Sequence, residues 1–254
     1  MSAADRYLGT TIARLDELRE SQGDAVAAAG RACADSIAAG KLVFTFGTGH
    51  GSFAALETFP RTGTPVGFRP IVETPIALFH HVLGDMGSYQ YRFLHTREGY
   101  GKAILRAHRL DPADTMMLFS HSGINAVILD MAVEAKQLGM RLVGVTSVPH
   151  SSQVESRHSC GKRLYELANV VVDTRVPLRD AAVDIEGLDD PVGPTSTVVA
   201  VAAAHAIVAA TVEELAARGT PPRIMVSPNV RDAAAAHAHN DENYEQLWQL
   251  LSSR

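Results

Sequence analysis

The feature that most constrains the fold is an apolar run that ends in a glycine-rich loop, within residues 41–59. The run Leu42–Phe46 is rich in β-branched and aromatic side chains, which favour a strand, and the loop Gly47–Ser52 follows it directly. Glycines let the backbone turn sharply and come close to a ligand. The next segment, Phe53–Glu57, is compatible with a helix, whose first N–H groups and positive dipole end suit a phosphate. The stretch predicts a strand, a loop and a helix, and the loop is either a phosphate-binding loop or a plain β–α turn.

A second stretch, residues 115–126, has the same layout. Its apolar run ends in Ser120–Gly123, residues 125–139 favour a helix, and Gly139 suits the position after the helix end. A third apolar run, 142–146, is followed by a serine. Loops at the C-terminal ends of parallel strands converge on a ligand crevice. The candidate residues for binding a phosphorylated or polyhydroxy anion are Thr48, Gly49, His50, Gly51, Ser52, Ser120, His121, Ser122, Gly123, Asn125 and Ser147.

The wider pattern alternates strand-like and helix-like segments, which predicts an α/β fold with a mainly parallel sheet. Helices are expected over residues 3–38 with a break near Gly23, and over 76–83, 102–108, 198–217 and 244–251. We expect a long loop near the pocket mouth at 84–97 and a solvated turn at 237–243. The alternation of apolar and acidic residues in Val183–Glu186 indicates a short strand rather than a metal site.

Composition narrows the class of protein. The 254 residues are 46% hydrophobic and 20% charged, as in ordinary soluble globular proteins. The net charge of −5 argues against general nucleic-acid binding. We expect no membrane span and no signal peptide, hence a cytoplasmic protein. Cys33 and Cys160 lie far apart and support neither a disulfide framework nor a zinc site. No metal or cofactor is expected.

The two loops also carry a family resemblance. GTGHGS, followed by FSHSGINAVILDMAVEAKQLGMRLVGVTS, resembles the SIS (sugar isomerase) domain over residues 35–215. A strict G-x-G-x-S motif would have its serine at Gly51, and here the hydroxyl comes one residue later, at Ser52. The phrases SRHSCGKRLYELA and VGPTSTV are similar to an uncharacterised bacterial subfamily, itself similar to N-acetylmuramic acid-6-phosphate etherase and to phosphosugar isomerases.

The resemblance implies a three-layer αβα sandwich with a mainly parallel, flavodoxin-like, five-stranded sheet and additional N- and C-terminal helices. A single SIS domain would then span 1–254, with N-terminal helices at 1–38, the α/β core at 39–217 and an extension at 218–254. It also implies a homodimer or homotetramer that binds a phosphorylated sugar. From the net charge and the lack of a long apolar run we expect binding to neither nucleic acid nor a membrane.

The expected activity is aldose–ketose isomerisation of a sugar phosphate by general acid–base catalysis. The alternatives are a sugar-phosphate etherase or lyase and a non-catalytic phosphosugar-sensing module. Both reactions need a carboxylate and a second acid or base, such as histidine. Arg157 is a candidate anion-binding residue, and Glu57 ranks last among the carboxylates because its side chain is expected to pack away from the ligand. The candidate catalytic residues are Glu98, Glu73, His158 and His80.

Overall fold

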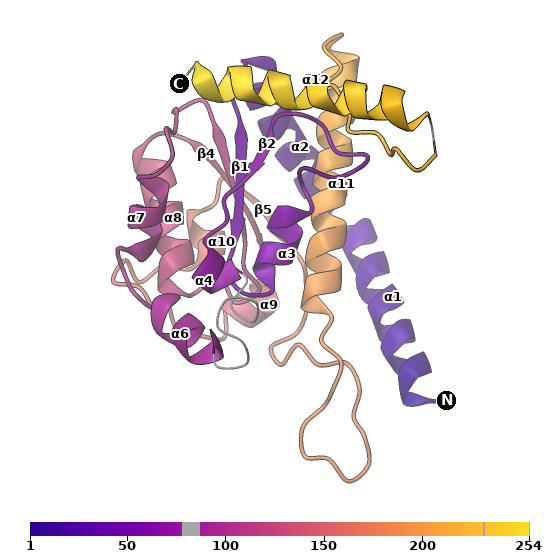
Figure 1. Ribbon diagram of the computed structural model, residues 1–254. Coiled ribbons are helices and arrows are strands. Elements are labelled where there is room, and N and C mark those ends of the chain that lie inside the picture. The colour runs from indigo at the N-terminus through magenta and orange to yellow at the C-terminus, as the bar shows by residue number, and fades with distance from the viewer. Residues whose placement is uncertain (78–86, 231, 254) are drawn as a thin grey trace.

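The computed structural model describes residues 1–77, 87–230 and 232–253. Its centre is a five-stranded parallel sheet in the order β2-β1-β3-β4-β5 (Figure 1). The chain leaves β1 toward β2 on one side and returns to β3 on the other, so the topological switch point lies between β1 and β3. The strands are β1 (Val43–Gly47), β2 (Phe68–Pro70), β3 (Thr115–Phe119), β4 (Arg141–Thr146) and β5 (Val170–Asp173).

Helices cover both faces of the sheet, which confirms the predicted three-layer αβα sandwich (Figure 1). One face carries α2 (Gly23–Ala38), α3 (Gly51–Leu56) and α11 (Ser196–Ala217). The other carries α7 (Tyr100–Leu105), α8 (Ala126–Gln137) and α10 (Leu164–Leu167). Outside these layers lie α1 (Ala3–Ser21), α4 (Thr74–Ala77), α6 (Gly87–Leu94), α9 (Val148–Ser151) and α12 (Ala233–Ser252).

The core explains why the central strands are continuously apolar. All five residues of β1 and all five of β3 are buried, because helices shield the sheet on both sides. On one of these faces α11 packs against α2 so closely that a Cβ on Gly30 would lie 2.7 Å from the Ala210 Cβ. In the part of the chain that the structure describes, α11 alone is long and apolar enough to cross a membrane. Part of this apolar helix is buried in the fold, where it packs against α2.

Three local expectations were wrong. Residues 87–94 form helix α6 rather than a loop, because Tyr91 and Leu94 pack against the core. The polar segment 237–243 is helical, because Asn243 is fully buried and its side chain donates to the Ile224 carbonyl while it accepts from Arg223. Val183 makes a single bridge with Val192 instead of a strand. Most of the helix expected at 76–83 lies outside the described residues.

Candidate functional site

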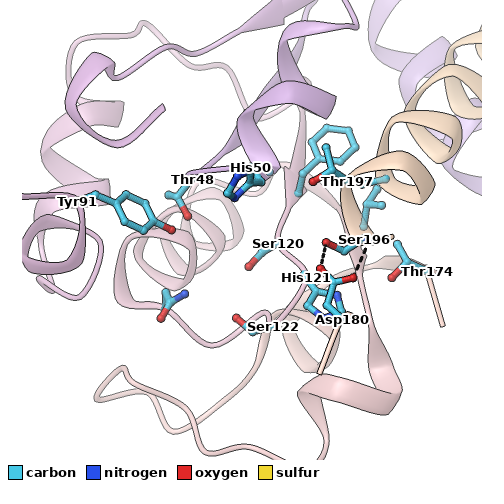
Figure 2. Close-up of a pocket in the computed structure, with 15 residues that line it drawn as sticks. Thr48, His50, Tyr91, Ser120, His121, Ser122, Thr174, Asp180, Ser196 and Thr197 are labelled. Atoms are coloured by element: carbon cyan, nitrogen blue, oxygen red, sulfur yellow. Dashed lines mark hydrogen bonds between the residues drawn. The ribbon is translucent and has the colours of Figure 1, made fainter. Parts of the chain in front are cut away.

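A cavity of about 220 Å³ opens at the C-terminal ends of the strands, beside the switch point (Figure 2). Its walls come from the loops after β1, β3 and β5, together with α6 and the first turns of α11. The lining residues are Thr48, His50, Gly51, Tyr91, Phe119, Ser120, His121, Ser122, Asn125, Val145, Thr174, Asp180, Ser196, Thr197 and Ala200.

The loop after β1 is pressed against the end of β3, and its glycines make this possible. A Cβ on Gly47 would lie 2.3 Å from the Gly51 carbonyl atoms, and a Cβ on Gly51 would lie 2.7 Å from the Phe119 carbonyl oxygen. This packing positions Thr48 in the cavity wall, where it hydrogen-bonds with the Tyr91 hydroxyl. Burial raises the pKa of Tyr91, so its hydroxyl stays protonated at neutral pH and can donate to a ligand.

The loop after β3 presents hydroxyl and amide groups at the start of α8. Gly123 has a φ of +63° and donates its N–H to the Ser120 Oγ at 3.1 Å, which closes the turn. Asn125 occupies the N-cap position of α8, but its side chain makes no capping hydrogen bond. It instead lines the cavity and accepts from Arg157 Nη1 at 3.2 Å. Ser120, Ser122 and Asn125 therefore lie together at a helix N-terminus, which favours an anion.

The segment between β5 and α11 supplies a third wall. Asp180 adopts a φ of +47°, and its Oδ1 accepts from the Thr195 and Ser196 N–H groups at 2.9 and 2.8 Å. Its Oδ2 accepts from the Ser196 hydroxyl. Figure 2 shows this cluster on one side of the cavity, with Thr48 and Tyr91 on the other. The Asp180 carboxylate thus caps α11 while it borders the cavity.

His121, which lines the cavity, contacts a second histidine, His150. His150 Nδ1 and His121 Nε2 are 2.8 Å apart, and the two rings are close to perpendicular. Burial lowers the pKa of His121 to about 4, and the nearby Asp180 opposes that shift only in part. Burial also lowers the pKa of His150. Both rings are therefore neutral at pH 7, and one ring donates the hydrogen bond that the other accepts.

The structure brings together seven of the predicted binding residues, which are Thr48, His50, Gly51, Ser120, His121, Ser122 and Asn125. Gly49 and Gly123 shape the loops by their positive φ angles. Ser52 points away from the cavity, since its hydroxyl is buried and donates to the Gly49 and Ala77 carbonyls at 2.7 and 3.1 Å. Ser147 is fully buried, donates to the Val176 carbonyl, and caps α9. Both hydroxyls are used inside the fold.

Of the predicted catalytic residues that the structure describes, none lines this cavity. Glu98 is exposed and accepts from the Ser159 N–H and hydroxyl, both at 2.6 Å. Glu73 accepts from the Tyr100 hydroxyl at 2.6 Å. His80 lies outside the described residues.

His158 and Arg157 also interact with other residues of the fold. His158 Nε2 lies 3.1 Å from Asp130 Oδ1, and its Nδ1 accepts from the Cys160 N–H at 3.0 Å. This arrangement fixes the loop to α8. Arg157 is nearer the cavity through its bond to Asn125 but does not line it. Glu57, ranked last, forms an ion pair with Arg61, and its Oε2 lies 3.3 Å from His205 Nε2.

Sequence reasoning did not select Tyr91, Thr174, Asp180, Ser196 and Thr197 as site residues. The run Pro194–Thr197 before an apolar helix was a usable signal, because polar residues at a helix start often face a ligand at this sheet edge. Tyr91 gave no such signal, since its segment was expected to be a loop. The described lining includes no lysine or arginine, so an anion here would be held by hydroxyl, amide and N–H donors.

These features define a doubly wound α/β protein with a ligand crevice at its switch point. The sequence model of the SIS domain matches residues 6–147. A UPF0309 protein of Streptomyces griseus is 34% identical over 228 residues, which cover 89% of each chain. A second UPF0309 protein, from Shouchella clausii, is 34% identical over 233 residues, 91% of this chain and 92% of the relative. The chain belongs to the SIS domain family and, within it, to the UPF0309 proteins.

Solved structures share the fold at low sequence identity. A phosphoheptose isomerase from Neisseria gonorrhoeae superposes with a TM-score of 0.53 at 12% identity, over 82% of this chain and 96% of the other. A protein described as a phosphosugar isomerase involved in capsule formation, from Bacteroides fragilis, gives 0.51 at 20% identity, over 82% and 88%. At such identities the likeness concerns the fold.

Proposed function

We propose that this protein is a phosphosugar-binding enzyme that interconverts an aldose phosphate and a ketose phosphate by general acid–base proton transfer. The observation that supports it most directly is the convergence of two hydroxyl-rich loops on one cavity at the switch point of an SIS domain. The cavity offers many neutral donors and acceptors in a small volume, which suits a polyhydroxy ligand with one anionic group.

The phosphate is assigned to the end lined by Ser120, Ser122 and Asn125. These side chains lie at the start of α8, a twelve-residue helix whose positive dipole end favours an anion. The Thr48 and Tyr91 hydroxyls also border the cavity and extend the set of donors. Charge-assisted hydrogen bonds of this kind contribute about 1.5–3 kcal/mol each.

The sugar chain is then directed toward His121 and Asp180, where the remaining polar groups gather. Isomerisation moves a proton between two neighbouring carbons, and it needs a base beside those carbons and donors for the developing negative charge. The described lining holds histidines, hydroxyls and one carboxylate, which are groups suited to that task. The fold neighbours described as phosphosugar isomerases support this choice by analogy.

A non-catalytic phosphosugar sensor is the second candidate, and one observation favours it. The carboxylates expected to act as bases, Glu98 and Glu73, are engaged outside the cavity. Asp180, the carboxylate in the described lining, is occupied as the cap of α11. A protein that senses a sugar phosphate would need the phosphate-binding loops but would not need a catalytic base.

The test is a thermal-shift screen of the purified protein against sugar phosphates, free sugars and sugar sulfonates, followed by turnover assays on each ligand that binds. Binding to the folded state raises the melting temperature by mass action. We expect a selective rise with one sugar phosphate and its conversion to the isomer. Binding without turnover would instead establish the sensor, and no rise with any phosphorylated sugar would refute both.

A matched pair of serine variants checks the assignment of the phosphate end. Ser122→Ala removes a hydroxyl from the cavity wall, and affinity for the bound sugar phosphate should fall about tenfold, equivalent to about 1.4 kcal/mol. Ser253→Ala removes an exposed hydroxyl that donates to the Leu250 carbonyl and lies beside Lys41, at the opposite ends of the strands, and should leave the affinity unchanged. Equal affinities for the two variants would contradict the assignment.

A further inference from the structure

A second cavity lies between helix α12 and the edge strand β2, and we call it the α12 pocket. We propose that it binds a small monocarboxylic acid with an apolar body, whose carboxylate pairs with Arg69 and whose body lies against Trp248. The proposal does not depend on the proposed function, because this pocket and the cavity at the switch point share no described lining residue.

The size and the lining of the α12 pocket are those of a site for a small molecule. Its volume is about 390 Å³, within the roughly 300–1,000 Å³ that such sites have. The described lining comes from three segments, which are the end of α3 with the two residues that precede and include Pro60, strand β2 with Val72, and α12. Most of it is leucine, valine, proline and aromatic side chains, and Arg69 is its charged member. Pockets of this kind bind an apolar body and orient it with a few polar groups.

One face of α12 supplies the apolar wall. Four lining residues recur at the spacing of a single helix face, and they are Tyr244, Leu247, Trp248 and Leu251. Leu247 is buried in the core, and the Tyr244 ring packs edge-on against Phe59 with centroids 6.2 Å apart. Trp248 lies on the same face but is 65% exposed. A ligand whose apolar body covers this indole would remove a large apolar surface from water.

Arg69 gives the pocket a positive charge that no described residue pairs with. It lies on β2, is partly buried, and makes no hydrogen bond or ion pair with any part of the chain that the structure describes. Its Nε is the guanidinium nitrogen that is buried without a partner, so a ligand would meet the two Nη nitrogens. Burial lowers the pKa of His108, and the charge of Arg69 adds to that shift. Polar groups at such sites are nearly always paired, so an acceptor supplied by a ligand is expected here.

The charge of the lining selects the class of ligand. The described lining holds one arginine and no carboxylate, so a ligand with a single negative charge would neutralise the pocket. A dianion would leave an excess negative charge in apolar surroundings, which is costly. A carboxylate also matches the planar guanidinium, because two N–H donors can meet its two oxygens. A sugar phosphate suits this pocket poorly, since the apolar walls would leave its hydroxyls without partners.

The experiment uses Trp248 as its probe. It is the single tryptophan of the chain, so tryptophan emission reports on the α12 pocket. The purified full chain is titrated at pH 8 with octanoate, with the uncharged octanamide, with octyl phosphate as a dianion, and with acetate, which has a carboxylate but no apolar body. Fluorescence follows the indole, and calorimetry measures affinity and stoichiometry for the same four compounds.

We expect octanoate to saturate one site per chain and to move the emission of Trp248 to shorter wavelength, because its acyl chain excludes water from the indole. Octanamide should bind about tenfold more weakly or worse, since it lacks the charge that pairs with Arg69. Octyl phosphate should also bind more weakly than octanoate, and acetate should leave the emission unchanged.

Two variants separate the charge from the apolar wall. Arg69→Gln should weaken octanoate about tenfold or more and leave octanamide within a factor of about three. Arg141→Gln, at an exposed arginine on β4 three strands away from β2, is the matched control and should change neither affinity. Trp248→Ala, followed by calorimetry, should weaken octanoate and octanamide by a similar factor. Melting temperatures verify that each variant is folded.

Several outcomes would overturn the proposal. Equal affinities of the wild-type protein for octanoate and octanamide, stronger binding of octyl phosphate, or unchanged octanoate affinity in folded Arg69→Gln would refute the monocarboxylate. An emission that ignores all four compounds but shifts with protein concentration would show that a second copy of the chain covers the pocket. No response in fluorescence or calorimetry would show that the pocket takes no such ligand. The sugar-phosphate screen concerns the other cavity, so its result is independent of these.

Discussion

The carboxylate of Asp180 is the cap of α11, with its Oδ1 2.8 Å from the Ser196 N–H and its Oδ2 bonded to the Ser196 hydroxyl. The two residues lie sixteen positions apart and belong to the same cavity wall. The contact therefore connects the start of the longest described helix to the candidate site.

Asp180→Ala should destabilise the fold by about 1–2 kcal/mol, because it leaves two N–H groups of α11 without their acceptor. It also places alanine at a φ of +47°, a region that asparagine and aspartate tolerate better. Asp180→Asn should cost less, since the amide oxygen can still accept from both N–H groups. Urea unfolding measures the difference, and equal losses in the two variants would show that the cap contributes little.

Ser52→Ala and Ser122→Ala should separate stability from binding. The Ser52 hydroxyl is buried and donates inside the fold, so its loss should lower the free energy of unfolding by about 1–2 kcal/mol with little change in ligand affinity. The Ser122 hydroxyl lines the cavity, so its loss should weaken binding with little change in stability. Thermal melts with and without ligand test both effects. A loss of affinity in Ser52→Ala at unchanged stability would restore the sequence-based prediction for that residue.

Stability should decrease as the pH falls from about 6.5 to about 4. Burial lowers the pKa of His121 to about 4, whereas an unfolded histidine titrates near 6.5, so the unfolded chain binds more protons between these values. The contribution of His121 is fully present above pH 6.5 and is lost as the pH approaches 4. Its size is on the order of 2 kcal/mol after solvent screening.

Urea denaturation across this pH range measures the slope. His121→Gln should have a shallower dependence than wild type, because glutamine does not titrate. The burial-lowered pKa values of His95, His108 and His150 leave some dependence in the variant. Identical slopes for the two proteins would show that His121 has an ordinary pKa in the folded state.

The two cysteines should differ in reactivity. Cys33 is fully buried in α2, and burial raises the pKa of its thiol to about 12, so almost no thiolate is present at pH 8. Cys160 is partly exposed. Ellman's reagent should modify one thiol rapidly in the native protein and a second only in denaturant. The Cys160→Ser variant should lack the rapid phase, and a rapid phase that persists would mean that α2 opens readily.

The sequence by itself predicted the elements that local pattern controls. Continuous apolar runs marked the buried strands, and glycine with hydroxyl residues after two of them marked the loops that line the cavity, because parallel strands present their C-terminal ends at one edge. The pattern of a parallel α/β fold followed from the alternation of these segments, and the family resemblance added the five strands.

Other features depended on contacts between distant segments, which only the tertiary structure decided. Ser52 turns inward because the glycine at 51 is packed against Phe119, and no local signal gives that rotation. Tyr91, Asp180 and Ser196 reach the cavity from α6, the long β5–α11 segment and α11, so their meeting depends on how three separated elements pack. The histidine pair formed in the same way. Local sequence sets the conformation of each segment, whereas the packing of layers determines which side chains share a cavity.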